Sequence, residues 1–441
     1  MATFDLKLIN GIVHLPGGPV AADIGVTAGR IAAIGATGDA GRTIDCRGLD
    51  ILPGVIDTQV HFREPGLVHK EDLESGSRAA VMGGVTAVFE MPNTKPNTDS
   101  ADAIADKIAR AKDRMWCDHA FYVGATNHNA RDLAELERLP GTAGVKIFMG
   151  ASTGDLLVSE DARLAEVLAS GHRRVAIHAE DEARMNARAG ERISGDPSSH
   201  PVWRDDESAI LATRRILALA RAARRRIHVL HVTTPAELEL LGANKDIASC
   251  EVTPQHLTLA GEEAYPRLGT LAQMNPPIRS GAHRDGLWHW LNQGVPDVIG
   301  SDHAPHTLEE KAVAYPGSPS GMPGVQTLLP LLLDHVAQGR LTLQRVIELT
   351  SAGAQRLFGI VGKGRIVTGY DADFTVVDLK ARWRVEEQWL ASRSGWSPFT
   401  GMELTGRPIG TIVRGDVAMW DGELGERATG APVRFEAVEF G

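Results

Sequence analysis

The chain has 441 residues, 43% of them hydrophobic and 23% charged, which is ordinary for a globular enzyme and long enough for a barrel of about 250 residues with an accessory domain. Its formal net charge of −10 argues against non-specific binding to nucleic acid or anionic membranes, but it leaves room for an anionic substrate beside a local arginine. The sequence has no run of about 18 apolar residues, so no membrane span is expected.

The three cysteines are spread along the chain without the spacing of a metal site, and their odd number favours a reducing compartment; they are Cys46, Cys117 and Cys250. The opening MATFDLKLING lacks the basic region and apolar core of a secretion signal. We therefore expect a cytoplasmic protein.

Both ends of the chain are rich in short strands. Residues 1–52 show apolar runs separated by Gly and Asp at hairpin spacing, and the same texture returns in residues 364–379 and 410–422. We predict that the two ends pair into one small β-sandwich. The alternative is two unrelated β extensions.

Between the two ends, strand and helix patterns alternate, which is typical of a parallel sheet. Eight units fit a closed (β/α)8 TIM-type barrel better than an open sheet, and no GxGxxG follows the first strand, which disfavours dinucleotide binding. The predicted domains are 1–53, 54–360 and 361–441. The eight predicted strands are residues 54–61, 84–92, 117–125, 144–150, 174–180, 227–232, 247–253 and 297–302.

Helix start signals support this alternation. Thr234 followed by Pro235 predicts a capped helix, and Asn129 and Ser159 are further candidate caps. Three connections after strands are long, at 180–205, 253–281 and 303–323, and long loops in a barrel are commonly functional. Residues 306–324, rich in Pro, Gly and Ser, are expected to form either a mobile lid or a solvated loop.

A polar side chain with metal-binding capacity stands at or near the end of five predicted strands: His61, Lys146, His178, His231 and Asp302. In a closed parallel barrel all carboxyl ends meet on one face, so these residues should converge. His and Asp suit Zn²⁺ or a similar divalent ion. Taken singly, each His is more often a polar residue beside a loop, and Asp302 is equally compatible with a turn cap.

Lys146 lies within the apolar run GVKIFMG, where an unpaired ammonium is costly to bury. It therefore needs either a carboxylate partner or chemical modification. A carbamylated Lys146 acts as a carboxylate and can bridge two ions.

The motifs DTQVHFREPG, MPNT, VKIFMG, IHAED, HVTT, MNPPIR and GSDHAPH run through nearly the whole chain. In them the sequence resembles the amidohydrolase superfamily and, within it, the dihydroorotases. The resemblance implies a cyclic amidase that interconverts dihydroorotate and N-carbamoyl-aspartate in pyrimidine synthesis, with one or two zinc ions. One departure is clear: the family opens with His-x-His, whereas this chain has Gln59-Val60-His61. An amide oxygen is a weaker ligand than imidazole, so one of the two metal sites is expected to be weak or empty.

The resemblance also implies roles in substrate binding and proton transfer. Asp302 would take a proton from the attacking water and pass it to the leaving nitrogen. Arg63, Asn93 and His306 match the family positions that bind the substrate carboxylate, and Asn275 matches the position that contacts the ring. The alternatives are a salt bridge from Arg63 to Glu64 or Glu71, and a turn role for Asn275. His256 is expected to have a core or loop role.

Two rival functions remain open from the sequence. One is another cyclic amidase, of the allantoinase or hydantoinase type, with the same metal chemistry. The other is a weakly active relative that serves as a structural partner of aspartate transcarbamoylase. A homo-oligomer is expected.

Overall fold

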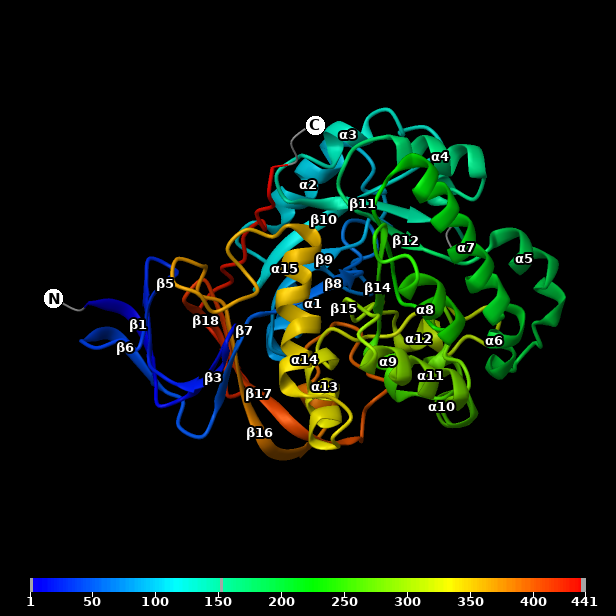
Figure 1. Cartoon of the computed structure of the whole chain (residues 1–441). Coiled ribbons are helices and arrows are strands. Elements are labelled where there is room, and N and C mark those ends of the chain that lie inside the picture. Colours follow the sequence, from blue (N-terminus) through cyan, green and yellow to red (C-terminus); the bar gives the residue numbers. More distant parts are fainter. Residues whose placement is uncertain (1–2, 151–153, 438–441) are drawn as a thin grey trace.

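The computed structural model describes residues 3–150 and 154–437. Its centre is a sheet of eight parallel strands that are neighbours in the order β8 to β15 (Figure 1). The circle closes where the end of β8 meets the turn after β15, because the N–H of His61 donates to the carbonyl of His303 at 2.7 Å. The strands are β8 (Val55–Val60), β9 (Val85–Glu90), β10 (Asp118–Gly124), β11 (Thr142–Phe148), β12 (Val175–His178), β13 (Ile227–Val229), β14 (Ala248–Val252) and β15 (Val298–Ile299). The predicted barrel and its eight strands are confirmed.

Helices follow the strands and cover the outside of the barrel (Figure 1). Their bounds are α1 (Leu73–Met82), α2 (Ala101–Ala111), α3 (Leu133–Leu136), α4 (Asp161–Ala169), α5 (Glu182–Ala187), α6 (His200–Trp203), α7 (Asp206–Ala223), α8 (Pro235–Gly242), α9 (Pro254–Thr258), α10 (Gly261–Leu268), α11 (Gly281–Asn292), α12 (Leu308–Lys311), α13 (Leu328–Ala337), α14 (Leu343–Ile347) and α15 (Gly353–Phe358). None of the described helices is both long and apolar enough to cross a membrane.

The two ends of the chain form a sandwich beside the barrel, as predicted. One sheet has the order β5-β4-β1-β6, and the other has the order β19-β18-β17-β16-β7-β2-β3, which joins strands from both ends (blue beside orange and red in Figure 1). The strands are β1 (Phe4–Ile9), β2 (Ile12–Leu15), β3 (Gly18–Ala21), β4 (Ile24–Thr27), β5 (Arg30–Ile34), β6 (Ala40–Asp45), β7 (Asp50–Pro53), β16 (Phe374–Arg384), β17 (Glu403–Val413), β18 (Asp416–Trp420) and β19 (Glu423–Leu424).

The predicted domain limits stay predictions. The last described residues leave the sandwich and return to the barrel, where Pro432 pairs with His119 of β10 and Phe435 pairs with Ile360. The C-terminal segment therefore contributes to both parts of the fold.

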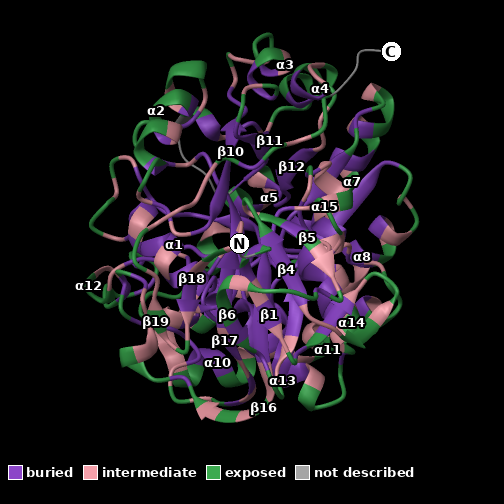
Figure 2. Cartoon of the chain, turned by 90° about the vertical axis from the view of Figure 1, so that its left-hand side faces the viewer, coloured by how far each residue is buried: buried purple, intermediate pink, exposed green. Residues whose placement is uncertain are grey.

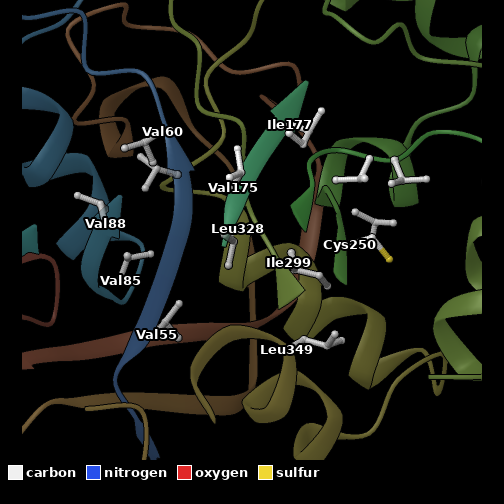
Figure 3. Packing of buried hydrophobic residues seen from close by; sticks show 14 of the residues in the cluster. Val55, Val60, Val85, Val88, Val175, Ile177, Cys250, Ile299, Leu328 and Leu349 are labelled. Atoms are coloured by element: carbon white, nitrogen blue, oxygen red, sulfur yellow. The ribbon is translucent and has the colours of Figure 1, made fainter. Parts of the chain in front are cut away.

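The barrel is held by aliphatic side chains between its strands and the outer helices. Figure 3 shows Val175 and Ile177 of β12 and Ile299 of β15 in one cluster with Leu328 of α13. Buried residues gather along the strands, and exposed ones lie on the outer helices and loops (Figure 2). β-Branched residues dominate these strands because both faces of a parallel sheet are covered.

One of the three expected helix caps is present. The hydroxyl of Thr234 accepts from the N–H of Glu237 at 3.1 Å, with Pro235 opening α8. Ser159 was wrongly predicted as a cap, since α4 begins after Glu160 without a side-chain cap. Asn129 was also wrong: its side chain accepts from the N–H of Thr126 at 2.8 Å, which stabilises a turn before α3 instead.

The long loop at 306–324 is anchored. Nζ of Lys311, on α12, donates to the carbonyls of Gln273 at 3.0 Å, Pro319 at 2.9 Å and Gly321 at 3.0 Å. Three carbonyl acceptors satisfy a buried ammonium and fix the loop over the carboxyl ends of the strands. In this structure the segment is therefore attached to the barrel and is not a freely solvated loop.

Candidate metal centre and active site

The end of β8 and the turn after β15 bring three predicted site residues together. Nε2 of Gln59 donates to Oδ1 of Asp302 at 3.0 Å, and Nε2 of His61 lies 3.1 Å from the same oxygen. Gln59 and His61 thus share one face of their strand, as the alternation of side chains predicts. On its other side the imidazole bonds through Nδ1 to Oδ1 of Asn93 at 2.7 Å.

The hydrogen bond to Asn93 determines which ring nitrogen of His61 carries the proton. Because an amide oxygen only accepts, Nδ1 of His61 carries the proton and Nε2 presents a lone pair. That lone pair points at Oδ1 of Asp302, which is also an acceptor. Two acceptors 3.1 Å apart repel each other unless a cation lies between them.

A second pair of predicted residues stands at the ends of β12 and β13. Nδ1 of His178 lies 3.0 Å from Nε2 of His231, and Nε2 of His178 bonds to Glu180 at 2.8 Å. Nε of Arg204 donates to Glu180 at 3.1 Å, and all four side chains are buried. Burial raises the pKa of Glu180, but Arg204 and His178 outweigh this effect and hold it below the usual value. The carboxylate is therefore ionised and orients His178.

Lys146 is 1% exposed, on β11. Among the described residues its side chain has neither a hydrogen-bond acceptor nor a carboxylate partner, and Nζ lies 4.4 Å from the centroid of the Phe148 ring. Burial lowers its pKa to about 7, with Asp302 and Glu251 opposing the shift. Lys146 also lowers the pKa values of His178 and His231, so it interacts electrostatically with this pair as well as with Asp302. Of the two alternatives that the sequence required, a carboxylate partner for Lys146 is not found among the described residues.

The residues present fit a divalent metal in two respects. Oε1 of Gln59 and Nδ1 of His231 are buried without a hydrogen-bond partner in the described structure. His61 with Asp302, and His178 with His231, each place two donor atoms about 3 Å apart. In the described part of the chain no three His, Cys, Asp or Glu side chains form a metal site by themselves. Each pair therefore needs a further ligand to hold a metal ion.

The substrate-side candidates Arg63 and His306 are in contact. Nε of Arg63 donates to the carbonyl of Pro305 at 3.1 Å, and one of its terminal nitrogens lies 3.2 Å from Nε2 of His306. Nζ of Lys70 donates to Nδ1 of His306 at 3.1 Å, and Nε2 lies 3.0 Å from the carbonyl of Ser320. Burial, Arg63 and Lys70 lower the pKa of His306, so the imidazole is neutral.

These contacts leave N–H donors of the Arg63 guanidinium without an acceptor among the described residues. Since Nδ1 of His306 accepts from Lys70, its proton is on Nε2 and goes to Ser320, so Arg63 gains no acceptor there. The alternative of a salt bridge from Arg63 to Glu64 or Glu71 is wrong for the described residues, because Arg63 has no carboxylate within 4.0 Å among them. Burial lowers its pKa to about 10, which keeps it cationic at neutral pH.

Asn275 lies apart from this group. Its Oδ1 bonds to Nε2 of His200 at 2.9 Å, and no direct contact with Arg63 or Asp302 is recorded among the described residues. His256 has the structural role expected of it: Nδ1 bonds to the hydroxyl of Thr253 at 2.8 Å and Nε2 to the carbonyl of Pro276 at 3.1 Å.

The backbone is unusual at three site residues. Arg63, His231 and Asp302 have φ values of 66°, 37° and 45°, in the left-handed region that non-glycine residues rarely adopt. Such conformations persist where the surroundings fix them, and they cluster at functional sites. Here they turn three side chains from strand ends into the barrel mouth.

Sequence reasoning missed Glu180, Arg204 and Lys70. A usable signal existed for Glu180, because it follows His178 by two residues in IHAED and so falls on the same face of an extended segment. Arg204 and Lys70 come from long connections, and nothing in the local pattern indicates that they turn toward the site.

A model of the amidohydrolase family matches residues 51–418. The chain belongs to the amidohydrolase family. Dihydroorotase of Halobacterium salinarum is 38% identical over 417 residues, which cover 93% of this amidohydrolase and 96% of the relative. L-Hydantoinase of Paenarthrobacter aurescens is 34% identical over 445 residues, or 96% of each chain. The solved structure of L-hydantoinase from Arthrobacter aurescens matches with a TM-score of 0.91 at 32% identity, covering 98% of this chain and 100% of that one. The amidohydrolase is therefore a hydrolase of a family that is generally metal-dependent.

Proposed function

We propose that this amidohydrolase is a dihydroorotase, which reversibly hydrolyses the ring amide of dihydroorotate to give N-carbamoyl-aspartate in pyrimidine synthesis. The observation that carries the proposal is Arg63, a buried guanidinium without a carboxylate partner among the described residues, which is held by the carbonyl of Pro305 and interacts electrostatically with His61 and Asp302. Dihydroorotate bears a ring carboxylate, whereas hydantoin does not. A planar guanidinium fork binds a carboxylate through two parallel hydrogen bonds.

We propose zinc as the metal, held by two groups of side chains. His61, Asp302, Gln59 and Lys146 would form one site, and His178, His231 and Lys146 the other. Zinc bound there would supply Lewis-acid activation of the amide carbonyl and of water. Nitrogen and oxygen donors of this kind suit Zn²⁺, and the unpartnered Oε1 of Gln59 is the weakest of them.

Lys146 is proposed to be carbamylated. Carbamylation joins the neutral amine of Lys146 to the carbon of CO2 with release of one proton; starting from the ammonium, two protons are lost and a cation becomes an anion. That change removes the cost of burying the ammonium and adds an anionic oxygen ligand that the two ligand pairs would share.

The remaining roles belong to the chain's own groups. Asp302 takes the proton of the attacking water and delivers it to the leaving ring nitrogen, which balances the hydrolysis. Arg63 binds the substrate carboxylate, and the amide N–H of Asn93 is available to it because Oδ1 is engaged by His61. The proton on Nε2 of His306 is directed toward Ser320, and a ligand carboxylate would compete for it. Asn275 is proposed to contact the ring; its bond to His200 would have to rearrange.

A hydantoinase-type cyclic amidase is the second candidate, favoured by the structural match to L-hydantoinase. An allantoinase shares the same metal residues. Zinc-loaded protein should be assayed with dihydroorotate, hydantoin and allantoin at equal concentrations. A dihydroorotase prefers dihydroorotate by at least about tenfold in kcat/KM, since one charge-assisted contact supplies more than that. Equal or better turnover of hydantoin would overturn the assignment.

We further propose that the enzyme works in the cytoplasm as a homo-oligomer. The three cysteines are buried and free, which suits a reducing compartment. Association with aspartate transcarbamoylase is the alternative for a weakly active chain. Sedimentation with and without that enzyme, combined with the assay above, separates an active oligomer from an inactive partner.

A further inference from the structure

A cleft of about 310 Å³ lies at the end of the barrel opposite the candidate active site. Arg174 directly precedes β12 and Arg226 directly precedes β13, so the cleft is at the amino ends of strands. β12 ends four residues after Arg174, at His178, which puts about 13 Å of strand between the two faces. The cleft is therefore separate from the metal residues.

The lining of this cleft carries excess positive charge. Arg173, Arg174, Arg226 and Arg356 contribute four guanidinium groups, against the single carboxylate of Glu436. The whole chain has a net charge of −10, so this local excess has the opposite sign from the protein. Arg356 is paired with a carboxylate outside the cleft.

The other three arginines have no carboxylate within 4.0 Å among residues 3–150 and 154–437. Arg173 donates to the carbonyl of Thr142 at 2.5 Å and stacks on Phe435, with 4.9 Å from its Cζ to the ring centroid. Arg174 donates to the carbonyl of Ile227 at 2.9 Å, and its Nε is buried without a partner in the described structure. Backbone carbonyls and a ring thus hold the guanidinium groups of Arg173 and Arg174, while Glu137 and Asp297 offset their charges only through space, without an ion pair.

The charge of the cleft arginines is only partly compensated by protein carboxylates. Burial and then Arg226 lower the pKa of Arg174 to about 10, so at neutral pH the group stays charged beside another cation. A bound anion would remove this repulsion and occupy the free donors. The ring of Phe358, which also lines the cleft, packs edge-on against Phe89 and His228.

We propose that this cleft binds a phosphate group carrying about two negative charges. Arginine forks match phosphate oxygens bidentately, and three unpaired forks require more negative charge than one carboxylate provides. The shared chemistry is the phosphate dianion, whether as the free ion or as a phosphate monoester. The proposal is independent of the hydrolytic function, since no residue of the cleft belongs to the candidate active site.

Calorimetric titration of the zinc-loaded, full-length protein with inorganic phosphate and with adenosine monophosphate tests the proposal. Arg226→Glu should weaken binding of both by at least about tenfold, because it removes one charge-assisted contact and adds a like charge. Arg214→Glu is the matched control: Arg214 is exposed on α7 and makes no hydrogen bond or ion pair with the described residues. It should change the dissociation constants by less than about twofold, since surface charges act weakly at a distance.

Arg226→Gln gives a second variant in case the charge reversal disturbs folding, which circular dichroism and retained turnover report. Tighter binding of the monoester than of phosphate identifies an ester as the ligand, and equal binding identifies the free ion; both support the site. Absence of measurable heat at millimolar phosphate, or equal weakening by the Arg226 and Arg214 variants, would overturn it. If Arg226→Glu bound phosphate as tightly as the parent does, the phosphate would be bound at the active site and not in the cleft, and the proposal would be wrong.

Discussion

Nδ1 of His178 lies 3.0 Å from Nε2 of His231, although 53 residues separate the two in sequence. Two ligands of one tetrahedral zinc ion, each at about 2.0–2.1 Å, stand roughly 3.3 Å apart, so the imidazoles are nearly placed for a shared ion. The bond from His178 to Glu180 leaves Nδ1 free to accept, and Glu180 is fixed in turn by Arg204. The site is thus organised by its own hydrogen bonds.

Lys146→Ala should remove most bound metal and most activity, because both ligand pairs lose their shared anion. Metal content after gel filtration, and turnover of dihydroorotate, measure this. Excess short-chain carboxylic acid should restore part of the activity by occupying the gap. Lys112→Ala, on a surface lysine, is the control. Metal content and turnover equal to the parent's would refute the carbamylated lysine.

Glu180→Gln should lower metal affinity by about 10- to 100-fold, the usual effect of losing a carboxylate that orients a ligating histidine. The amide can still accept from His178, but it carries no charge to strengthen the imidazole as a donor or to pair with Arg204. Competition with a zinc chelator gives the affinity. If the variant held zinc as tightly as the parent, Glu180 would have no role in positioning His178.

The barrel and the convergence of His61, His178, His231 and Asp302 were predictable, because strand ends follow from apolar runs and a closed parallel sheet brings those ends to one face. The contacts of Lys70 and Arg204 were not, since both come from connections whose path depends on packing. The prediction that Asn129 caps a helix failed because its side chain accepts a hydrogen bond from the backbone N–H of Thr126 instead.

Arg63→Gln should raise the KM for dihydroorotate by roughly 30- to 150-fold, the equivalent of losing a buried charge-assisted contact of about 2–3 kcal/mol. Metal content should stay at the parent's value, because Arg63 donates to the carbonyl of Pro305 and lies against His306 rather than bonding to the metal residues. Hydantoin, which has no carboxylate, serves as the control substrate and should be affected much less. An unchanged KM would exclude Arg63 as the carboxylate-binding group.

His119→Phe should reduce the acid sensitivity of the fold. Burial lowers the pKa of His119 to about 4, from an unfolded value of about 6.5, so the unfolded state binds more protons between these values. Stability therefore falls as the pH drops through this window, and His119 contributes a loss of about 2 kcal/mol at pH 5. Urea unfolding at pH 7.5 and pH 5 should show a smaller difference for the variant. His289→Phe, at an exposed position on α11, should leave the difference as it is in the parent.

Gln59→His should increase metal occupancy. In the untouched chain Gln59 donates its N–H to Asp302 and offers only a neutral amide oxygen, Oε1, as a ligand. The ion held with His61 and Asp302 should therefore be labile, while the ion at His178 and His231 is held by two imidazoles. After mild chelation, elemental analysis should find closer to one ion per chain than two. Imidazole at position 59 completes the His-x-His pair and should bring the count toward two, whereas Gln59→Asn, which keeps the amide, should not. Two tightly held ions in the parent protein would show that the glutamine does not weaken the site.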